Sequence, residues 1–212
     1  MALPSSSADW HELVAIILIS VTTIITAWTA FQASKWGGLM LINFSQASAA
    51  RIDAARFESD ANRQASVQIA LSTQWLSAQT TENEKLAGFL RDSFPGPLAT
   101  ATSDWLDERA ADAQAAPQTP FDMPSYVLDN AVRAEEKQAQ AEQLSAQALT
   151  SNRNSDSYTA LTILFATVLF SAAVSNLMKK SMNSWTLIGV ALVVFVSSAT
   201  VLASLPKLFR RG

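Results

Sequence analysis

The stretch from Leu13 to Phe31 contains no charged residue and is almost entirely apolar. An α-helix rises ~1.5 Å per residue, so these nineteen residues cover roughly the 30 Å hydrocarbon core of a bilayer. Trp10 and Trp36 flank the stretch where membrane proteins place interfacial aromatic side chains. The sequence therefore predicts an N-terminal tail and a first transmembrane helix within residues 1–36.

A cleaved signal peptide is the alternative interpretation of this stretch. The preceding tail reads MALPSSSADWHE and carries no Lys or Arg, whereas a signal peptide begins with a positively charged region. The apolar part is also too long for a signal peptide, and no small-x-small cleavage site follows it. We expect an uncleaved span.

Two further apolar segments lie near the other end of the chain. Residues 158–178 predict a second transmembrane helix, and residues 185–212 predict a third one with a basic tail. Residues 179–184 form a short basic loop between them. Residues 37–157 contain sixteen acidic and nine basic residues, which is typical of a soluble acidic insert. The predicted fold class is an all-α membrane protein, with three transmembrane helices and a helical insert.

The insert has the pattern of a long antiparallel helical hairpin with a short extra helix. A 3-4 spacing of mostly small residues continues the first helix past its span. The members of this stripe are Ala47, Ala50, Ala54, Phe57, Ala61, Gln64, Gln68, Leu71, Trp75 and Ala78. The helix either continues to Phe94 or bends near residues 80–83, and both alternatives stay open. Pro95-Gly96-Pro97 ends it in either case.

The second half of the insert begins after these prolines. A short amphipathic helix is expected over residues 98–115, with Leu98, Trp105 and Leu106 buried. Residues 116–124 predict an ordered extended loop anchored by Phe121 and Met123. Pro124 suits the first position of a returning polar helix, which leads through a polar collar at residues 152–157 into the second span.

A stripe of small and hydroxylated residues on the first span is the candidate site. Its members are Ser20, Thr23, Ala27, Ala30 and Ser34, and Thr22, Thr26 and Thr29 lie on an adjoining face. Such residues either let helices pack closely and hydrogen-bond to one another, or line a wet pore. No span contains a charged residue, which is the usual marker of an ion-coupled pathway. Packing is therefore the preferred interpretation.

Two further features lie where the first helix leaves the membrane. Trp36, Gly37 and Gly38 predict either a hinge or a close contact with the collar at residues 152–157. Lys35 and Asp156 are expected at similar depth, close enough to form an ion pair.

The sequence contains no pattern that predicts catalysis. The only histidine, His11, stands at the start of a helix near the interface, and the chain has no cysteine. A catalytic triad, thiol chemistry and a zinc site are therefore not expected. Four carboxylates on the short helix, Asp104, Asp107, Glu108 and Asp112, predict a solvated acidic face rather than a cation site. We expect no enzyme activity, no cofactor or metal, and no nucleic-acid partner, because no basic patch with aromatic residues exists.

Several stretches carry a resemblance to a known family. They read AWTAFQASKWGG (27–38), VQIALSTQWLSA (67–78), LAGFLRDSFPGPLATATSDWL (86–106), APQTPFDMPSYVL (116–128) and NRNSDSYTALTILFATVLF (152–170). The chain resembles a family of uncharacterised bacterial inner-membrane proteins with three spans and a helical insert. The resemblance implies a periplasmic insert, and it supplies no activity and no catalytic residues.

The charges of this chain depart from that family pattern. Its N-terminal tail has no basic residue, and its C-terminus has extra ones. Lys179 and Lys180 favour a periplasmic insert by the positive-inside rule, whereas the larger number of basic residues at the other membrane face favours a cytoplasmic one. We follow the family and expect a periplasmic insert.

Three functions agree with this pattern. The first is a structural or scaffolding protein that forms a homo-oligomer through its long helices. The second is an oligomeric channel lined by the Ser/Thr face of the first span. The third is a sensor or accessory subunit whose insert binds a partner protein.

Overall fold

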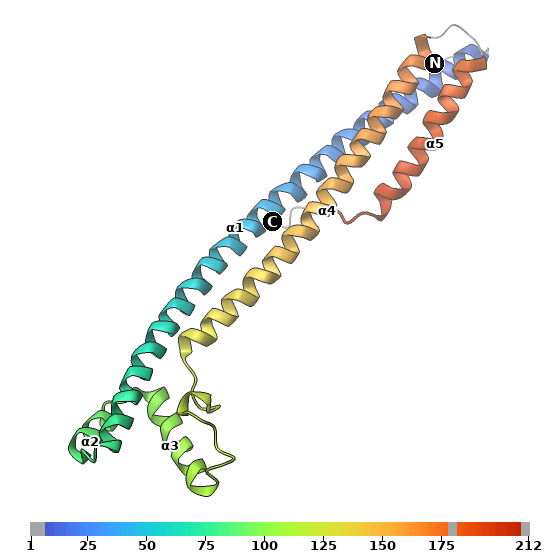
Figure 1. Ribbon diagram of the computed structural model, residues 1–212. Coiled ribbons are helices and arrows are strands. Elements are labelled where there is room, and N and C mark those ends of the chain that lie inside the picture. Colours follow the sequence, from blue (N-terminus) through green and yellow to red (C-terminus); the bar gives the residue numbers. More distant parts are fainter. Residues whose placement is uncertain (1–6, 178–181, 209–212) are drawn as a thin grey trace. The chain divides into compact units, whose positions relative to one another are not determined.

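The computed structural model describes residues 7–177 and 182–208, and these residues form helices joined by short connections (Figure 1). In chain order the elements are α1 (Ser7–Thr80), α2 (Glu84–Asp92), α3 (Gly96–Ala111), a single 3-10 turn η1 (Pro120–Asp122), α4 (Asp129–Leu177) and α5 (Met182–Ser204). The all-helical fold class is confirmed. Three helices, α1, α4 and α5, are long and apolar enough to cross a membrane.

The chain divides into two compact units. Unit 1 comprises Met1–Ser45 with Leu144–Gly212, and unit 2 comprises Gln46–Gln143. Helices α1 and α4 belong to both units, so no loop separates either apolar segment from the polar helix that continues it. The basic loop predicted at residues 179–184 lies largely outside the described residues, since α5 begins at Met182.

The long first helix ends at Thr80 and does not continue to Phe94. Glu82 has a φ of 55°, in the left-handed region that a helix cannot accommodate. Asn83 then caps α2, and its Oδ1 accepts a hydrogen bond from the backbone N–H of Leu86 at 3.2 Å. Of the two alternatives, the bend at residues 80–83 is the one observed.

Helix α3 is shorter than predicted and ends at Ala111 rather than at residue 115. The Asp112 carboxylate accepts hydrogen bonds from the backbone N–H groups of Gln114 and Ala115 at 2.9 and 3.2 Å. Such an Asx turn competes with the helix for these donors. Leu98 and Trp105 are buried as predicted, whereas the prediction for Leu106 is wrong, since 41% of it is exposed.

The loop after α3 is anchored as expected, but the next helix starts later than predicted. Met123 is buried, and Phe121 packs against Tyr126 edge to face at 5.0 Å. The backbone N–H of Tyr126 donates to Met123 O at 2.9 Å, which forms a turn. Helix α4 therefore begins at Asp129, and the prediction that Pro124 is its first residue is wrong. Residues 152–157 are an uninterrupted part of α4.

The core of unit 2 has two parts with different side chains. Where α1 ends, aromatic and aliphatic residues of α1, α2, α3 and the loop pack together, including Trp75, Leu90, Phe94 and Trp105. Earlier in α1, the buried positions of the stripe are Ala47, Ala50, Ala54, Ala61 and Gln68. Gln64, predicted in the same stripe, is exposed, and Ser72, which was not predicted, is buried.

Candidate functional site

The residues that pack the helices of unit 1 together include a polar seam on α1. Thr22, Thr29 and Gln32 of α1 are fully buried. Their spacing of seven and three residues puts them on one face of the helix. The Thr29 and Thr162 hydroxyl oxygens lie 3.0 Å apart and join α1 to α4. Each hydroxyl also lies within hydrogen-bond distance of a carbonyl of its own helix, Thr29 of Thr26 O at 2.9 Å and Thr162 of Tyr158 O at 3.0 Å.

The seam also holds the segment that follows α5. The Gln32 side chain accepts a hydrogen bond from the Leu208 backbone N–H at 3.1 Å and donates a longer one, 3.5 Å, to Leu208 O. The Tyr158 hydroxyl of α4 donates to Pro206 O at 3.0 Å, and the Tyr158 side chain is fully buried. One amide and one phenol thus bind main-chain groups of residues 206–208, which follow the end of α5 at Ser204.

The rest of this bundle is apolar, with a few hydroxyls inside it. Leu18, Val168, Ala172 and Ala191 form its buried cluster. The Thr22 hydroxyl is also buried, and its oxygen has no hydrogen-bond partner. Such a group costs free energy in an apolar interior. Together these contacts use the Thr22–Thr29–Gln32 face of α1 for packing within one chain.

The predicted stripe of small and hydroxylated residues on the first span lies on a different face of α1, and all five of its residues are exposed. The residues are Ser20, Thr23, Ala27, Ala30 and Ser34. The hydroxyls of Ser20 and Thr23 each donate to the carbonyl four residues earlier, both at 2.8 Å. The adjoining threonine face makes the contact between helices within the chain. Sequence reasoning missed Gln32, although an amide in phase with Thr22 and Thr29 was the available signal.

The Gly37–Gly38 pair lies within α1, and the helix is not interrupted there. A Cβ atom added to Gly37 would lie 3.5 Å from the Ser155 hydroxyl oxygen, and one added to Gly38 would meet no atom within 4 Å. Ser155 donates to Ala33 O at 3.0 Å. The structure thus places Gly37 against the collar, as the close-contact alternative requires. Trp36 is half-buried, and its indole N–H is buried without a partner.

Lys35 and Asp156 do not form an ion pair. The Lys35 ammonium lies 5.5 Å from the centre of the Phe31 ring, and Asp156 accepts a hydrogen bond from Asn152 at 3.1 Å. Each side chain instead contacts a residue four positions away in its own helix, where i, i+4 neighbours share one face.

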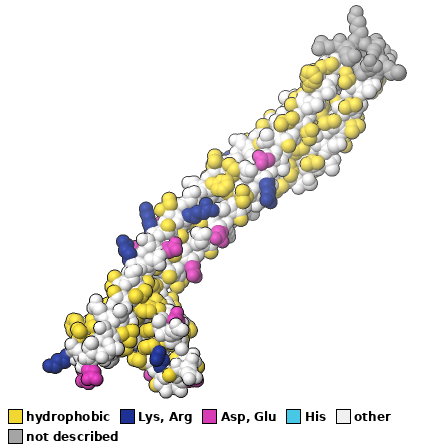
Figure 2. Space-filling view, in the orientation of Figure 1, with side chains coloured by type: hydrophobic (Ala, Val, Ile, Leu, Met, Phe, Trp, Pro, Cys, Tyr) yellow, Lys and Arg dark blue, Asp and Glu magenta, His cyan; other side chains and the backbone are white. Residues whose placement is uncertain are grey.

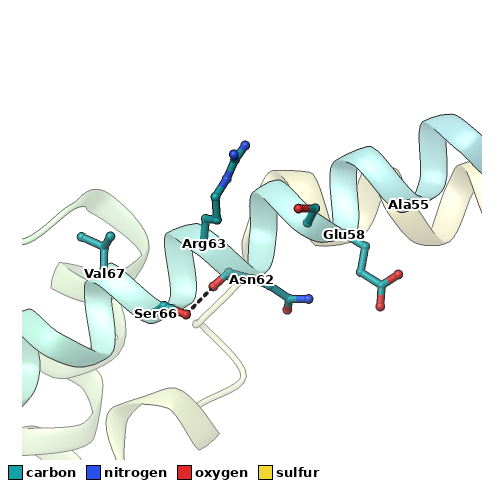
Figure 3. A pocket seen from close by; sticks show the side chains of 7 residues that line it. Ala55, Glu58, Asn62, Arg63, Ser66 and Val67 are labelled. Carbon is teal, nitrogen blue, oxygen red and sulfur yellow. Dashed lines mark hydrogen bonds between the residues drawn. The ribbon is translucent and has the colours of Figure 1, made fainter.

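One shallow hollow is lined by residues of α1 alone, between Ala55 and Val67. Its side chains leave the helix in different directions, with Arg63 and Glu58 pointing apart (Figure 3). Within the described part of the chain, no three His, Asp or Glu residues gather as metal ligands. The side chain of His11 lies outside the described residues.

Comparisons with known proteins add no relative: no family model, no curated protein and no solved structure matches this chain.

Proposed function

We propose that this chain is a multi-pass integral membrane protein that forms a homo-oligomer and serves a structural or scaffolding role. The apolar segments of α1, α4 and α5 are its three spans. Helices α1 and α4 continue out of the bilayer as an antiparallel hairpin, and α2, α3 and η1 complete the insert. Following the family resemblance, we propose the bacterial inner membrane as its location, with the insert in the periplasm.

The observation that carries this proposal is the placement of large and small apolar residues in unit 2. Along α1 most of the buried positions hold alanines, whereas Ile52 is 55% exposed and Val67 is 60% exposed. Ile69 and Leu76 are exposed as well. Hydrophobic side chains are therefore visible on the surface of this unit (Figure 2). An exposed apolar patch calls for an explanation, whereas a single exposed apolar residue does not.

The energetic consequence favours association. Burying one Ile or Val side chain is worth about 1.5–3 kcal/mol, and an alanine contributes much less. The buried alanines thus stabilise the two-helix part of unit 2 only weakly. The exposed Ile and Val side chains add buried apolar area, and therefore stability, when another copy covers them. Contiguous exposed apolar patches mark interaction surfaces, and we propose that these side chains form such a patch.

The outward stripe on α1 suits the same assembly inside the membrane. Copies with the same sidedness are related by an axis along the membrane normal, so equivalent residues of neighbouring copies lie at the same depth in the membrane. Ser20, Thr23, Ala27, Ala30 and Ser34 are small enough to let another helix approach closely. Because the Ser20 and Thr23 hydroxyl hydrogens are bonded within α1, this face suits helix packing better than a wet pore.

Single cysteines test the proposal directly, since the natural chain contains none. Ile52→Cys and Val67→Cys place the thiol on the exposed face, and Ala54→Cys and Ala61→Cys place it among the buried alanines as matched controls. In native membranes, a short bis-maleimide should cross-link the first pair into dimers and leave the controls monomeric. Equal cross-linking of all four variants, or none at any of them, would contradict the proposal.

A further inference from the structure

A second concavity in unit 2 has a different character from the hollow on α1. It has a volume of about 350 Å³ and lies where α1 ends beside α2 and α3. Its lining residues are Trp75, Gln79, Glu84, Ala87, Gly88, Arg91 and Leu106. Apolar side chains thus share the cavity with one cation and one anion.

Arg91 is the residue that gives this cavity its chemistry. Its guanidinium carbon lies 5.8 Å from the centre of the Trp75 ring and 5.5 Å from that of Phe94. Its Nη1 atom is buried and has no hydrogen-bond partner. The ion pairs found among the described residues join Arg56 to Asp53 and Arg63 to Asp60, and neither involves Arg91.

A partly buried guanidinium that makes no ion pair is unusual in energetic terms. Its five N–H groups require acceptors, and an unmade hydrogen bond of a charged group costs more than that of a neutral one. Cation–π attraction to the Trp75 and Phe94 rings offsets part of this cost. Because Nη1 has no accessible surface, the donors left for a ligand are Nε and Nη2, and two neighbouring N–H groups of a guanidinium form the planar fork that binds a carboxylate through two parallel hydrogen bonds.

The remaining lining decides what else the ligand carries. Trp75, Ala87 and Leu106 provide apolar surface beside Arg91. A Cβ atom added to Gly88 would meet nothing within 4 Å, so the space beside this glycine is open. Glu84 places a negative charge in the same cavity, which disfavours ligands with more than one negative charge.

We propose that this cavity binds a small monocarboxylate with an apolar body. The carboxylate would accept two hydrogen bonds from Arg91, and the apolar body would lie against Trp75 and Leu106. The inference concerns unit 2 of a single chain and does not depend on the oligomer proposed above.

Fluorine NMR on the detergent-solubilised full chain provides the test, with 4-fluorophenylacetate as the probe. Its neutral amide, 4-fluorophenylacetamide, is the matched control, and inorganic phosphate is the competing anion. The acid should show saturable line broadening, the amide should show at least about tenfold weaker binding because it lacks the charge-assisted pair, and phosphate should not displace the acid.

Three variants connect the binding to the named residues. Arg91→Met keeps the apolar stem and should weaken binding at least about tenfold. Gly88→Leu should abolish binding by filling the cavity, and it should fold because the added atoms enter open space in a helix. Glu84→Gln should tighten binding. Equal affinity for the acid and the amide, unchanged binding in Gly88→Leu, or no broadening at millimolar probe would overturn the proposal.

Discussion

Gln32 binds the main chain of Leu208, which lies 176 positions further along the sequence, through both ends of its side-chain amide. The side chain of Gln32 is fully buried, so no water replaces these hydrogen bonds if they are lost. Leu208 belongs to the segment that follows α5, and the neighbouring Pro206 carbonyl accepts a hydrogen bond from Tyr158. A pair of side chains from α1 and α4 therefore fixes the end of the third apolar helix.

Replacing Gln32 with leucine should release this segment. The variant leaves the N–H and C=O of Leu208 without partners, and we expect it to lose about 1–3 kcal/mol of unfolding free energy. Reversible unfolding in mixed detergent micelles measures the loss. A cysteine at position 207 should also react faster with a maleimide in the variant than in the parent chain.

The control for this prediction is Phe31→Leu, one residue earlier on an exposed part of α1. It should change neither the stability nor the thiol reactivity appreciably. If Gln32→Leu behaved like Phe31→Leu, the contact with Leu208 would not contribute to stability.

The hydrogen bond between Thr29 and Thr162 should show a measurable coupling energy. We expect a double-mutant cycle of Thr29→Val and Thr162→Val to give about 0.6 kcal/mol, the average for hydrogen bonds between helices in a membrane. Thr23→Val, on the exposed face of α1, is the matched control and should show no coupling with Thr162→Val. Additive effects of the Thr29 and Thr162 changes would indicate that the two hydroxyls do not interact.

The two glycines at positions 37 and 38 should both accept alanine. Alanine is favoured over glycine by about 1 kcal/mol inside a helix, and neither added Cβ meets an atom closer than 3.5 Å. Both variants should therefore unfold at a higher detergent fraction. Gly37→Leu should lower stability instead, because the larger side chain displaces Ser155 from Ala33. A loss of stability in Gly38→Ala would instead support a hinge.

Tyr126 should make the insert less stable at alkaline pH. Burial raises the pKa of Tyr126 above its ordinary value of 10.0. Because the folded state holds the proton more tightly than the unfolded state, the related stability is present below pH 10 and is lost as the pH rises through the folded pKa. Thermal unfolding from pH 8 to 11 should show this decline, and Tyr126→Phe should reduce it.

Tyr126→Phe has a second expected effect at neutral pH. The Tyr126 hydroxyl is buried without a hydrogen-bond partner, so its removal should raise the unfolding temperature. An unchanged alkaline decline together with a lower unfolding temperature would show that this hydroxyl is solvated or bonded in solution.

The sequence predicts the helices well because their signals are local. Charge-free runs, the proline pair at residues 95–97 and the 3-4 spacing of alanines each act within a few turns of helix. The sequence does not decide whether the helix bends at residues 80–83, because the residue types found there occur both in helices and in turns. The late start of α4 was missed because Pro124 fits a helix start, while the contact of Phe121 with Tyr126 holds the following residues in a turn.

The candidate site was harder to predict than the helices. The face that begins with Ser20 and ends with Ser34 adjoins the face that holds Thr22, Thr29 and Gln32. Both have a similar composition, so periodicity alone does not decide which of the two faces contacts α4. The partner of Thr29 is Thr162, and the partner of Gln32 is a main-chain segment near the other end of the chain. Contacts at such separations have no local signal in a single sequence.

The most direct test of the proposed assembly is the mass of the full chain released from lipid nanodiscs, measured by native mass spectrometry. We predict one defined oligomer for the parent chain and for the apolar control Ile52→Leu with Val67→Ile. The double variant Ile52→Glu with Val67→Glu should shift the population towards monomer, because it places charges on the proposed contact face. A monomeric parent chain, or an oligomer that both glutamates leave unchanged, would contradict the proposal.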